Sequence, residues 1–107
     1  MMRVVDIPNE VRLEEIFSVR LEFENTTDHA SRFKMSCGNS PVCAIGDTSF
    51  DVGRLEPGER SVLEFEAIAL SAGIQKLCPI TVTDLSHKAR SSHKFEDYCR
   101  VLVLASE

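Results

Sequence analysis

The strict alternation of apolar and polar residues from position 17 to position 24 constrains the fold of this chain most strongly. The odd positions are apolar and the even positions polar, in the order Phe-Ser-Val-Arg-Leu-Glu-Phe-Glu. Because successive side chains of a β-strand point to opposite faces, this period predicts a strand with one buried face. No segment keeps an apolar period of 3.6 residues over three turns, so we expect no helix.

Further strands are expected along the whole chain, separated by turn-forming sequences. Glu56-Pro57-Gly58-Glu59 predicts a type II turn, since Pro presets φ and Gly accepts the positive φ that follows. A polar stretch rich in Ser, His, Lys and Arg is expected to be a loop between the last two strands. The expected strands cover residues 3–7, 17–24, 32–37, 42–45, 49–55, 61–70, 77–83 and 98–104.

Seven or eight short strands in 107 residues favour one domain, an all-β antiparallel sandwich of immunoglobulin type over residues 1–107. A small closed barrel is the alternative. The antibody hallmarks are missing, because the chain has no Trp and Tyr98 precedes Cys99 by one residue, where a tyrosine corner needs two. The sequence therefore predicts a sandwich of a kind other than the antibody domains.

Charge and hydropathy restrict the compartment and the partners. Twelve Lys and Arg against 17 Asp and Glu give a net charge of -5, which disfavours binding to nucleic acid or anionic lipid. No apolar run approaches the roughly 20 residues of a membrane span, and no secretory leader is recognisable. We therefore expect a cytoplasmic protein without membrane insertion, in which the sequon at Asn25 is a turn rather than a glycan site.

The four cysteines are expected to be reduced, since disulfides are rare in the cytosol. No C-x-x-C pair is present, so zinc binding is disfavoured, and no cofactor is expected. Cys37 continues the apolar face of its strand and is expected to be buried. Cys43 lies near a loop tip and is expected to be the most exposed and the most readily oxidised thiol.

Catalytic motifs are missing from the sequence. It contains no G-x-S-x-G elbow, no phosphate-binding loop and no H-E-x-x-H pair. Asp84, Ser86, His87 and His93 could be drawn as a hydrolytic set, but a solvated connection between strands is the simpler explanation. Asp84 is expected to accept backbone hydrogen bonds from the loop that follows it. We expect no enzymatic activity and no small-molecule substrate.

Two groups of surface residues could bind partners. Four carboxylates on neighbouring strands are expected to share one face and to be offset by nearby arginines. The carboxylates are Glu22, Glu24, Glu64 and Glu66, and the arginines are Arg3, Arg20 and Arg60.

The last strand carries the stronger indication of an interface. Residues 101–104 are apolar on both faces, although a sandwich strand needs only one apolar face. Val101 and Val103 are expected in the core, so the other face requires a cover from a loop, another domain or another subunit. The candidate partner-binding residues are Tyr98, Arg100, Leu102, Leu104, Ile68 and Leu70.

Four stretches of the second half carry a family resemblance. They read FDVGRLEPG at 50–58, GIQ at 73–75, ITVTD at 80–84 and FEDY at 95–98, each beside an apolar strand. Over residues 50–104 the chain resembles the C-terminal β-sandwich of subunit 13 of the transport protein particle complex, TRAPP. The resemblance implies a non-catalytic subunit of this vesicle-tethering complex, which promotes nucleotide exchange on Rab GTPases in ER–Golgi, Golgi and autophagy traffic.

The same resemblance implies protein subunits of a tethering complex as partners and a cytoplasmic location at the Golgi and other endomembranes. Proteins of this family are several times longer, so the chain is expected to be either an excised domain or a short relative. Two alternatives remain from the residues themselves. One is a free-standing adaptor that binds peptides along a strand edge, and the other is a small hydrolase or redox protein.

Overall fold

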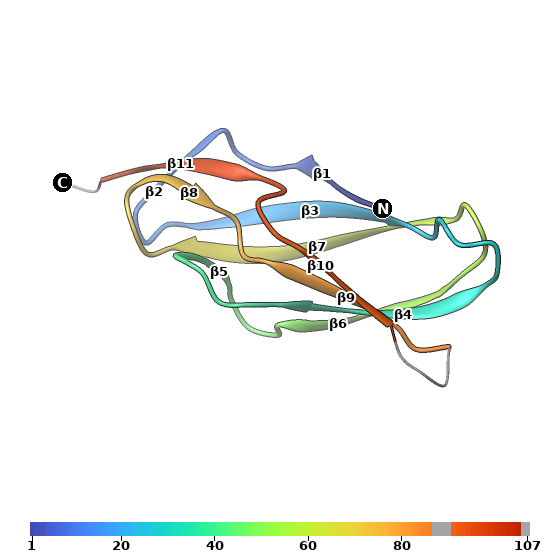
Figure 1. Cartoon of the computed structure of the whole chain (residues 1–107). Helices are drawn as coiled ribbons and strands as arrows, with labels where there is room; N and C mark the ends of the chain where they lie inside the picture. The colour runs from blue at the N-terminus through green and yellow to red at the C-terminus, as the bar shows by residue number, and fades with distance from the viewer. Residues whose placement is uncertain (87–90, 106–107) are drawn as a thin grey trace.

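The computed structural model describes residues 1–86 and 91–105, and these residues form eleven β-strands and no helix (Figure 1). The strands are β1 (Met2–Asp6), β2 (Glu10–Arg12), β3 (Ile16–Glu24), β4 (Ser31–Cys37), β5 (Val42–Ala44), β6 (Ser49–Leu55), β7 (Arg60–Ala69), β8 (Gly73–Lys76), β9 (Ile80–Asp84), β10 (Ser91–Phe95) and β11 (Arg100–Leu104). No helix in this part of the chain has the length and hydropathy of a membrane span.

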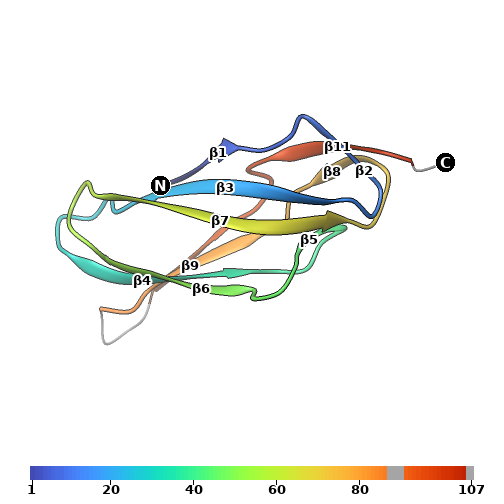
Figure 2. The same cartoon turned by 180° about the vertical axis from the view of Figure 1, so that it is seen from behind.

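The strands form three sheets. Two four-stranded sheets, in the orders β1-β3-β7-β5 and β10-β9-β4-β6, lie face to face as a sandwich (Figure 2). A third sheet, β2-β11-β8, lies at the end of the molecule that carries the C-terminus (Figure 1). All neighbouring strands are antiparallel except β2 and β11, which are parallel. The all-β sandwich predicted from the alternation is therefore confirmed.

The core lies between the two large sheets and has the strand phases that the sequence predicts. On β3, Val19 and Leu21 are fully buried, while the intervening side chains face outward. Contacts between the sheets are aromatic in part: the Phe23 and Phe33 rings meet edge to face, with centroids 5.0 Å apart. Burial of this apolar area is the main source of stability in a domain of this size.

The predicted number of strands was wrong, because three strands lack the expected pattern. Strands β2 and β8 have only three and four residues, too few for a period to be recognised. Strand β10 lies within the stretch predicted to be a loop, and its sequence, Ser-Ser-His-Lys-Phe, is almost entirely polar. It pairs along one side with β9, so main-chain hydrogen bonds rather than alternation define it.

Two predicted strand boundaries shift by more than one residue. The strand expected at 77–83 begins at Ile80, after Pro79, and Leu77 instead forms an isolated bridge with Val42. The strand expected at 98–104 begins at Arg100. The predicted type II turn at 56–59 is confirmed, since Gly58 has a φ of 81° and the Glu59 amide donates to the Glu56 carbonyl.

The Asn25 side chain holds the end of β3 to the opposite turn. It is fully buried, and its Nδ2 donates to the carbonyls of His29 and Leu55 at 3.0 and 2.9 Å. Its Oδ1 accepts from the amide and the hydroxyl of Thr27. The Asn25 side chain therefore holds the turn after β3 that the sequence predicts.

Replacing Asn25 with alanine is expected to lower the free energy of unfolding by about 2–3 kcal/mol. The substitution removes the donors of two carbonyl groups, of which that of Leu55 is buried. Thr26→Ala, at the exposed neighbouring position, is the matched control and should stay within about 0.5 kcal/mol of the parent. Urea denaturation followed by circular dichroism measures both, and equal midpoints would contradict this role of Asn25.

The four predicted surface carboxylates lie on the outer face of the adjacent strands β3 and β7, and the predicted arginines pair with three of them. Arg3 contacts Glu22 at 2.9 Å, Arg20 contacts Glu64 at 3.1 Å, and Arg60 contacts Glu24 at 2.9 Å. The pKa of Glu22 is lowered by its hydrogen bond from Arg3. This acidic face is therefore largely offset within the domain, as the sequence predicts.

The residues considered as a hydrolytic set have structural partners. Oδ1 of Asp84 accepts the Ser86 amide at 2.9 Å, which confirms the predicted loop-capping role. The Ser86 hydroxyl accepts the Arg32 amide at 2.8 Å, and His93 lies on β10 beside Phe95. His87 lies outside the described residues.

The cysteines are unpaired in the structure, and the predictions for two of them need correction. Cys37 is half-buried rather than fully buried, because it lies at the end of β4. Cys43 belongs to β5 and is also half-buried, whereas Cys78 is fully buried. The pKa of Cys37 is raised by its hydrogen bond with the Cys78 thiol and by burial, and burial alone raises the pKa of Cys99.

The stability of the domain is expected to fall as the pH rises above about 8.5, the ordinary pKa of an unfolded thiol. Tyr98 and Cys99 have raised pKa values, so the folded chain keeps protons that the unfolded chain releases, whereas in the Cys37–Cys78 pair one pKa is raised and the other lowered. The unfolded state then binds fewer protons, and the free energy of unfolding decreases with pH. Thermal melts between pH 7 and 10.5 measure this decrease, and a constant melting temperature would show that these groups ionise in the folded state.

Candidate docking surface

The third sheet separates its apolar residues into a buried and an exposed set. Val11, Val101 and Val103 point inward and are each 2% exposed. On the other face, Leu102 of β11 pairs with Ile74 of β8, and these side chains are 39% and 71% exposed. The assignment of Val101 and Val103 to the core is thus confirmed, and the alternation explains why a strand that is apolar throughout leaves leucines on the surface.

We define the β11 face as the exposed side of this sheet, comprising Glu10, Arg12, Ile74, Lys76, Arg100, Leu102 and Leu104. Leu104, which is 38% exposed, pairs with Arg12, and Arg100 pairs with Lys76. Three large apolar side chains are therefore bordered by cationic ones. An apolar centre with a polar and charged rim is the usual composition of a protein–protein interface.

Arg100 is fixed at one end of the β11 face. Its guanidinium donates two hydrogen bonds of 2.8 Å to the Asp97 carboxylate, and the Lys76 ammonium lies 3.9 Å from the same group. The hydrogen bond from Arg100 lowers the pKa of Asp97. The bidentate geometry orders the arginine on the surface, although an exposed pair contributes little to stability.

Tyr98 is placed differently from the other residues of the predicted site. It is half-buried, packs against the core and donates from its hydroxyl to the Cys78 carbonyl at 2.7 Å. Burial raises the pKa of this phenol. Tyr98 thus anchors the entry to β11, whereas Arg100, Leu102 and Leu104 lie together on the β11 face as the sequence predicts.

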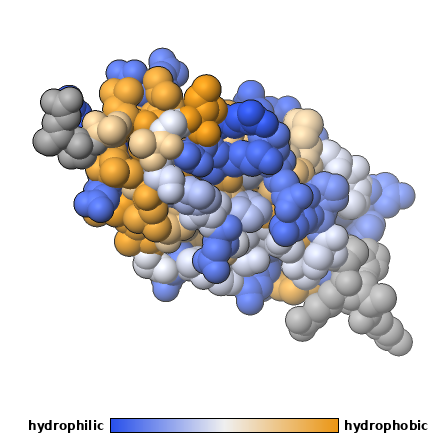
Figure 3. All heavy atoms as spheres, turned by 60° about the vertical axis from the view of Figure 1, so that its left-hand side comes forward, coloured by the Kyte–Doolittle hydropathy of each residue, from blue (hydrophilic) through white to orange (hydrophobic). Residues whose placement is uncertain are grey.

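Ile68 lies at the end of β7, in a different sheet, and Leu70 directly follows that strand. Ile68 is half-buried beside Ile16, its partner on β3, and Leu70 is 54% exposed. The connection between β2 and β3 links this region to the third sheet. The Leu13 amide donates to the Leu104 carbonyl, and the Glu14 amide donates to the Ala69 carbonyl. Figure 3 shows apolar side chains gathered at this end of the molecule, next to the C-terminus.

Ile74 is the surface residue that the sequence prediction missed. It falls between two predicted strands, in a stretch too short to show a period, and only its pairing with Leu102 places it on the β11 face. A hollow of about 410 Å³ adjoins it, bounded by Ser40 and Pro41 on one side and by Lys76 and Arg100 on another. No group of side chains in the described ranges could hold a metal ion.

The fold is that of β-sandwich domains in much larger proteins. Two structures of α-2-macroglobulin from Escherichia coli, one trypsin-activated and one native, superpose with TM-scores of 0.68 and 0.67. Their identities to this chain are 17% and 15%, and they cover 95% and 97% of it. The chain spans only 7% of either protein, so the likeness defines the architecture of the domain alone.

The family is defined by sequence. The model of the C-terminal region of trafficking protein particle complex subunit 13 matches residues 8–103, which is nearly the whole chain. A search of the curated proteins found no match. The chain belongs to the family of the C-terminal domain of TRAPP subunit 13, and the resemblance inferred from its second half is confirmed and extends through its first half.

Proposed function

We propose that this domain is a non-catalytic docking module that attaches to protein subunits of a TRAPP complex through the β11 face. The observation that carries the proposal is the cross-strand row of Ile74 and Leu102, which is exposed although both side chains are large and apolar. Burial of such a row on a partner would provide the central contacts of an interface. Membership of the subunit 13 family supports other subunits of that complex as the partners.

The family also supports a location and a process for the proposed interaction. We infer a cytoplasmic protein, peripheral to the Golgi and other endomembranes, that acts in vesicle-mediated transport. The partners are proteins rather than nucleic acid, membrane lipid or a small-molecule substrate. The net charge of -5 and the structural partners of Asp84 and Ser86 support this choice over nucleic-acid binding or hydrolysis.

Replacing Ile74 with lysine is expected to reduce recovery of TRAPP subunits about tenfold or more in co-precipitation with the tagged chain. A charge at the centre of an apolar contact would be desolvated without a partner, which weakens binding strongly. Because Ile74 is 71% exposed, the fold should be preserved. Quantitative mass spectrometry of the eluates measures the change.

Val62→Lys is the matched control for Ile74→Lys. Val62 is 54% exposed and lies on β7 opposite Glu22, away from the third sheet. This variant carries the same added charge and should recover the subunits at the parental level. Equal recovery by both variants would contradict docking through the β11 face.

A further inference from the structure

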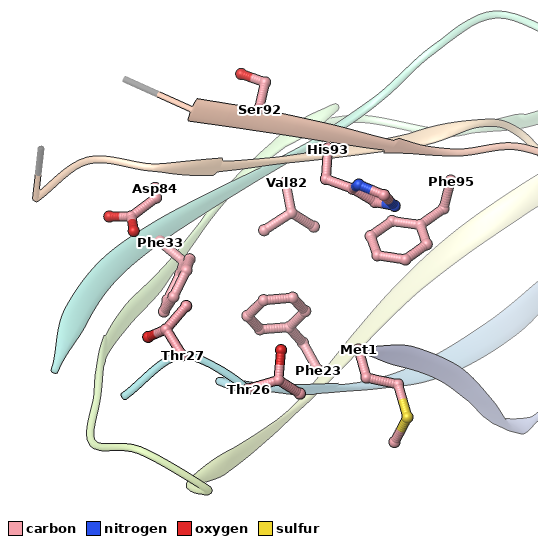
Figure 4. A pocket seen from close by; sticks show the side chains of 10 residues that line it. All are labelled: Met1, Phe23, Thr26, Thr27, Phe33, Val82, Asp84, Ser92, His93 and Phe95. Atoms are coloured by element: carbon pink, nitrogen blue, oxygen red, sulfur yellow. The ribbon is translucent and has the colours of Figure 1, made fainter. Parts of the chain in front are cut away.

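The sandwich is open along one side, between the edge strands of its two large sheets. Strand β10 is the first strand of one sheet and β1 the first strand of the other, so each pairs with a neighbour on one side only. A pocket of about 470 Å³ lies between these two sheets and is lined by residues of both edges (Figure 4). This side of the molecule is distinct from the β11 face, which belongs to the third sheet.

The pocket has an apolar interior and a polar rim. Phe23 and Phe33, which are 6% and 5% exposed, reach it from opposite sheets, and Val82 and Phe95 complete the apolar part. Figure 4 shows these four side chains directed into the same space from the surrounding strands. The hydroxyls of Thr26 and Thr27 and the side chains of Asp84 and His93 form the rim, whereas the Ser92 hydroxyl points away from the pocket to Thr83 (Figure 4). The pocket can therefore accept an apolar side chain whose main chain lies along the polar rim.

The hydrogen-bond register shows which main-chain groups of β10 face the open side. The Leu85 amide donates to the Arg32 carbonyl, and the Gly38 amide donates to the Pro79 carbonyl. Because main-chain hydrogen bonds alternate in direction along a strand, the amide and carbonyl groups of the odd-numbered residues of β9 point toward β4. The even-numbered residues of β9 then bond toward β10, where they pair with odd-numbered residues. The amide and carbonyl groups of Ser92 and Lys94 consequently point away from β9, to the open edge.

We propose that β10 accepts an extended segment of a partner protein as an added strand, with one apolar side chain of that segment inserted into the pocket. A strand is the occupant because Ser92 and Lys94 present donors and acceptors at strand spacing, which another extended main chain matches. Side chains of an added strand alternate, so every second one would enter the space beside His93 and Phe95. The segment is thus extended, with an apolar residue between short polar or β-branched ones.

The probe is a fluorescein-labelled peptide of sequence Lys-Thr-Val-Phe-Val-Thr-Lys, and fluorescence anisotropy measures its binding to the chain. Saturable binding with a dissociation constant below about 1 mM is expected. The same peptide with proline in place of its second valine lacks one amide donor and disfavours a regular strand, and it should bind at least about tenfold more weakly. Failure of the first peptide to saturate the chain would overturn the proposal.

Lys94→Pro tests the edge itself. The substitution removes an amide that points to the open side and leaves the bonds between β9 and β10 in place, and proline is tolerated at such edge positions. We expect Lys94→Pro to weaken peptide binding about tenfold or more, while Lys94→Ala, which keeps the amide, binds like the parent. Equal binding by both variants would overturn strand addition.

Two further measurements keep the proposal testable if Lys94→Pro does not fold. Amide hydrogen exchange of the parent chain should slow at Ser92 and Lys94 when the peptide is added, and should change little at His93 and Phe95, whose amides already face β9. Slowing at other edges, without a change at these two residues, would overturn the proposal. A second copy of the chain is the rival occupant of this edge, and sedimentation equilibrium of the chain alone tests it. A dimer whose formation slows amide exchange at Ser92 and Lys94 would assign the edge to that second copy and overturn the proposal.

Discussion

Truncation of Phe65 or Phe23 to alanine is expected to lower the free energy of unfolding by about 3–5 kcal/mol. Both side chains are 6% exposed and lie between the two large sheets. Phe65 packs on Phe50 with ring centroids 6.2 Å apart, and Phe23 packs on Phe33 at 5.0 Å. Each substitution removes apolar contacts and leaves a cavity that the surrounding strands fill only in part. The loss is a large fraction of the 5–15 kcal/mol typical of a domain.

Urea denaturation of the two variants measures these losses against a matched control. Ile16→Ala removes an apolar side chain of β3 that is 56% exposed, and it should cost much less than either phenylalanine. Parental midpoints for both Phe23→Ala and Phe65→Ala would mean that the inward faces of β3 and β7 have been assigned in reverse.

Introducing glutamate at Val101 is expected to unfold the domain, whereas Leu102→Glu should leave it folded and unable to hold its partners. The adjacent residues point to opposite sides of β11: Val101 is 2% exposed and Leu102 is 39% exposed. A carboxylate in place of Val101 would be buried without a partner, at a cost of several kcal/mol. At Leu102 the same group reaches water in the unbound domain, but it would be desolvated in a complex.

Circular dichroism and co-precipitation on this pair of variants separate folding from docking. We expect Val101→Glu to lose the cooperative melt, and Leu102→Glu to retain it while recovering about tenfold less of the TRAPP subunits. If Leu102→Glu unfolds and Val101→Glu melts normally, the two faces of β11 are reversed. If Leu102→Glu folds and recovers the subunits fully, the β11 face is not the docking surface.

The long half-buried strands could be predicted from the sequence because their alternation is a local property. Burial against the opposite sheet requires apolar side chains at every second position, and β3 and β7 satisfy this from Phe17 to Phe23 and from Leu63 to Ala69. The same reasoning placed Val101 inside and Leu102 outside. Turn chemistry was equally local, since Pro57 and Gly58 occupy the positions at which a type II turn needs them.

Strand β10 could not be predicted, because its stabilising contacts come from residues distant in sequence. Its main chain pairs with β9, while its side chains lie at an edge where polar residues are tolerated, so no apolar period marks it. The place of Ile74 depends on the same kind of pairing, between β8 and β11. Tyr98 illustrates a related limit: its aromatic ring suited an interface, but its hydroxyl bonds to Cys78, 20 residues earlier.

Site-specific photo-crosslinking of the chain in cells tests the docking surface most directly. A benzoylphenylalanine introduced at position 102 would lie within reach of any protein seated on the β11 face, and the same group at position 62 serves as the control. We predict that illumination links position 102, but not position 62, to a subunit of the TRAPP complex. Adducts with TRAPP subunits from position 62 alone, or from neither position, would contradict docking through the β11 face.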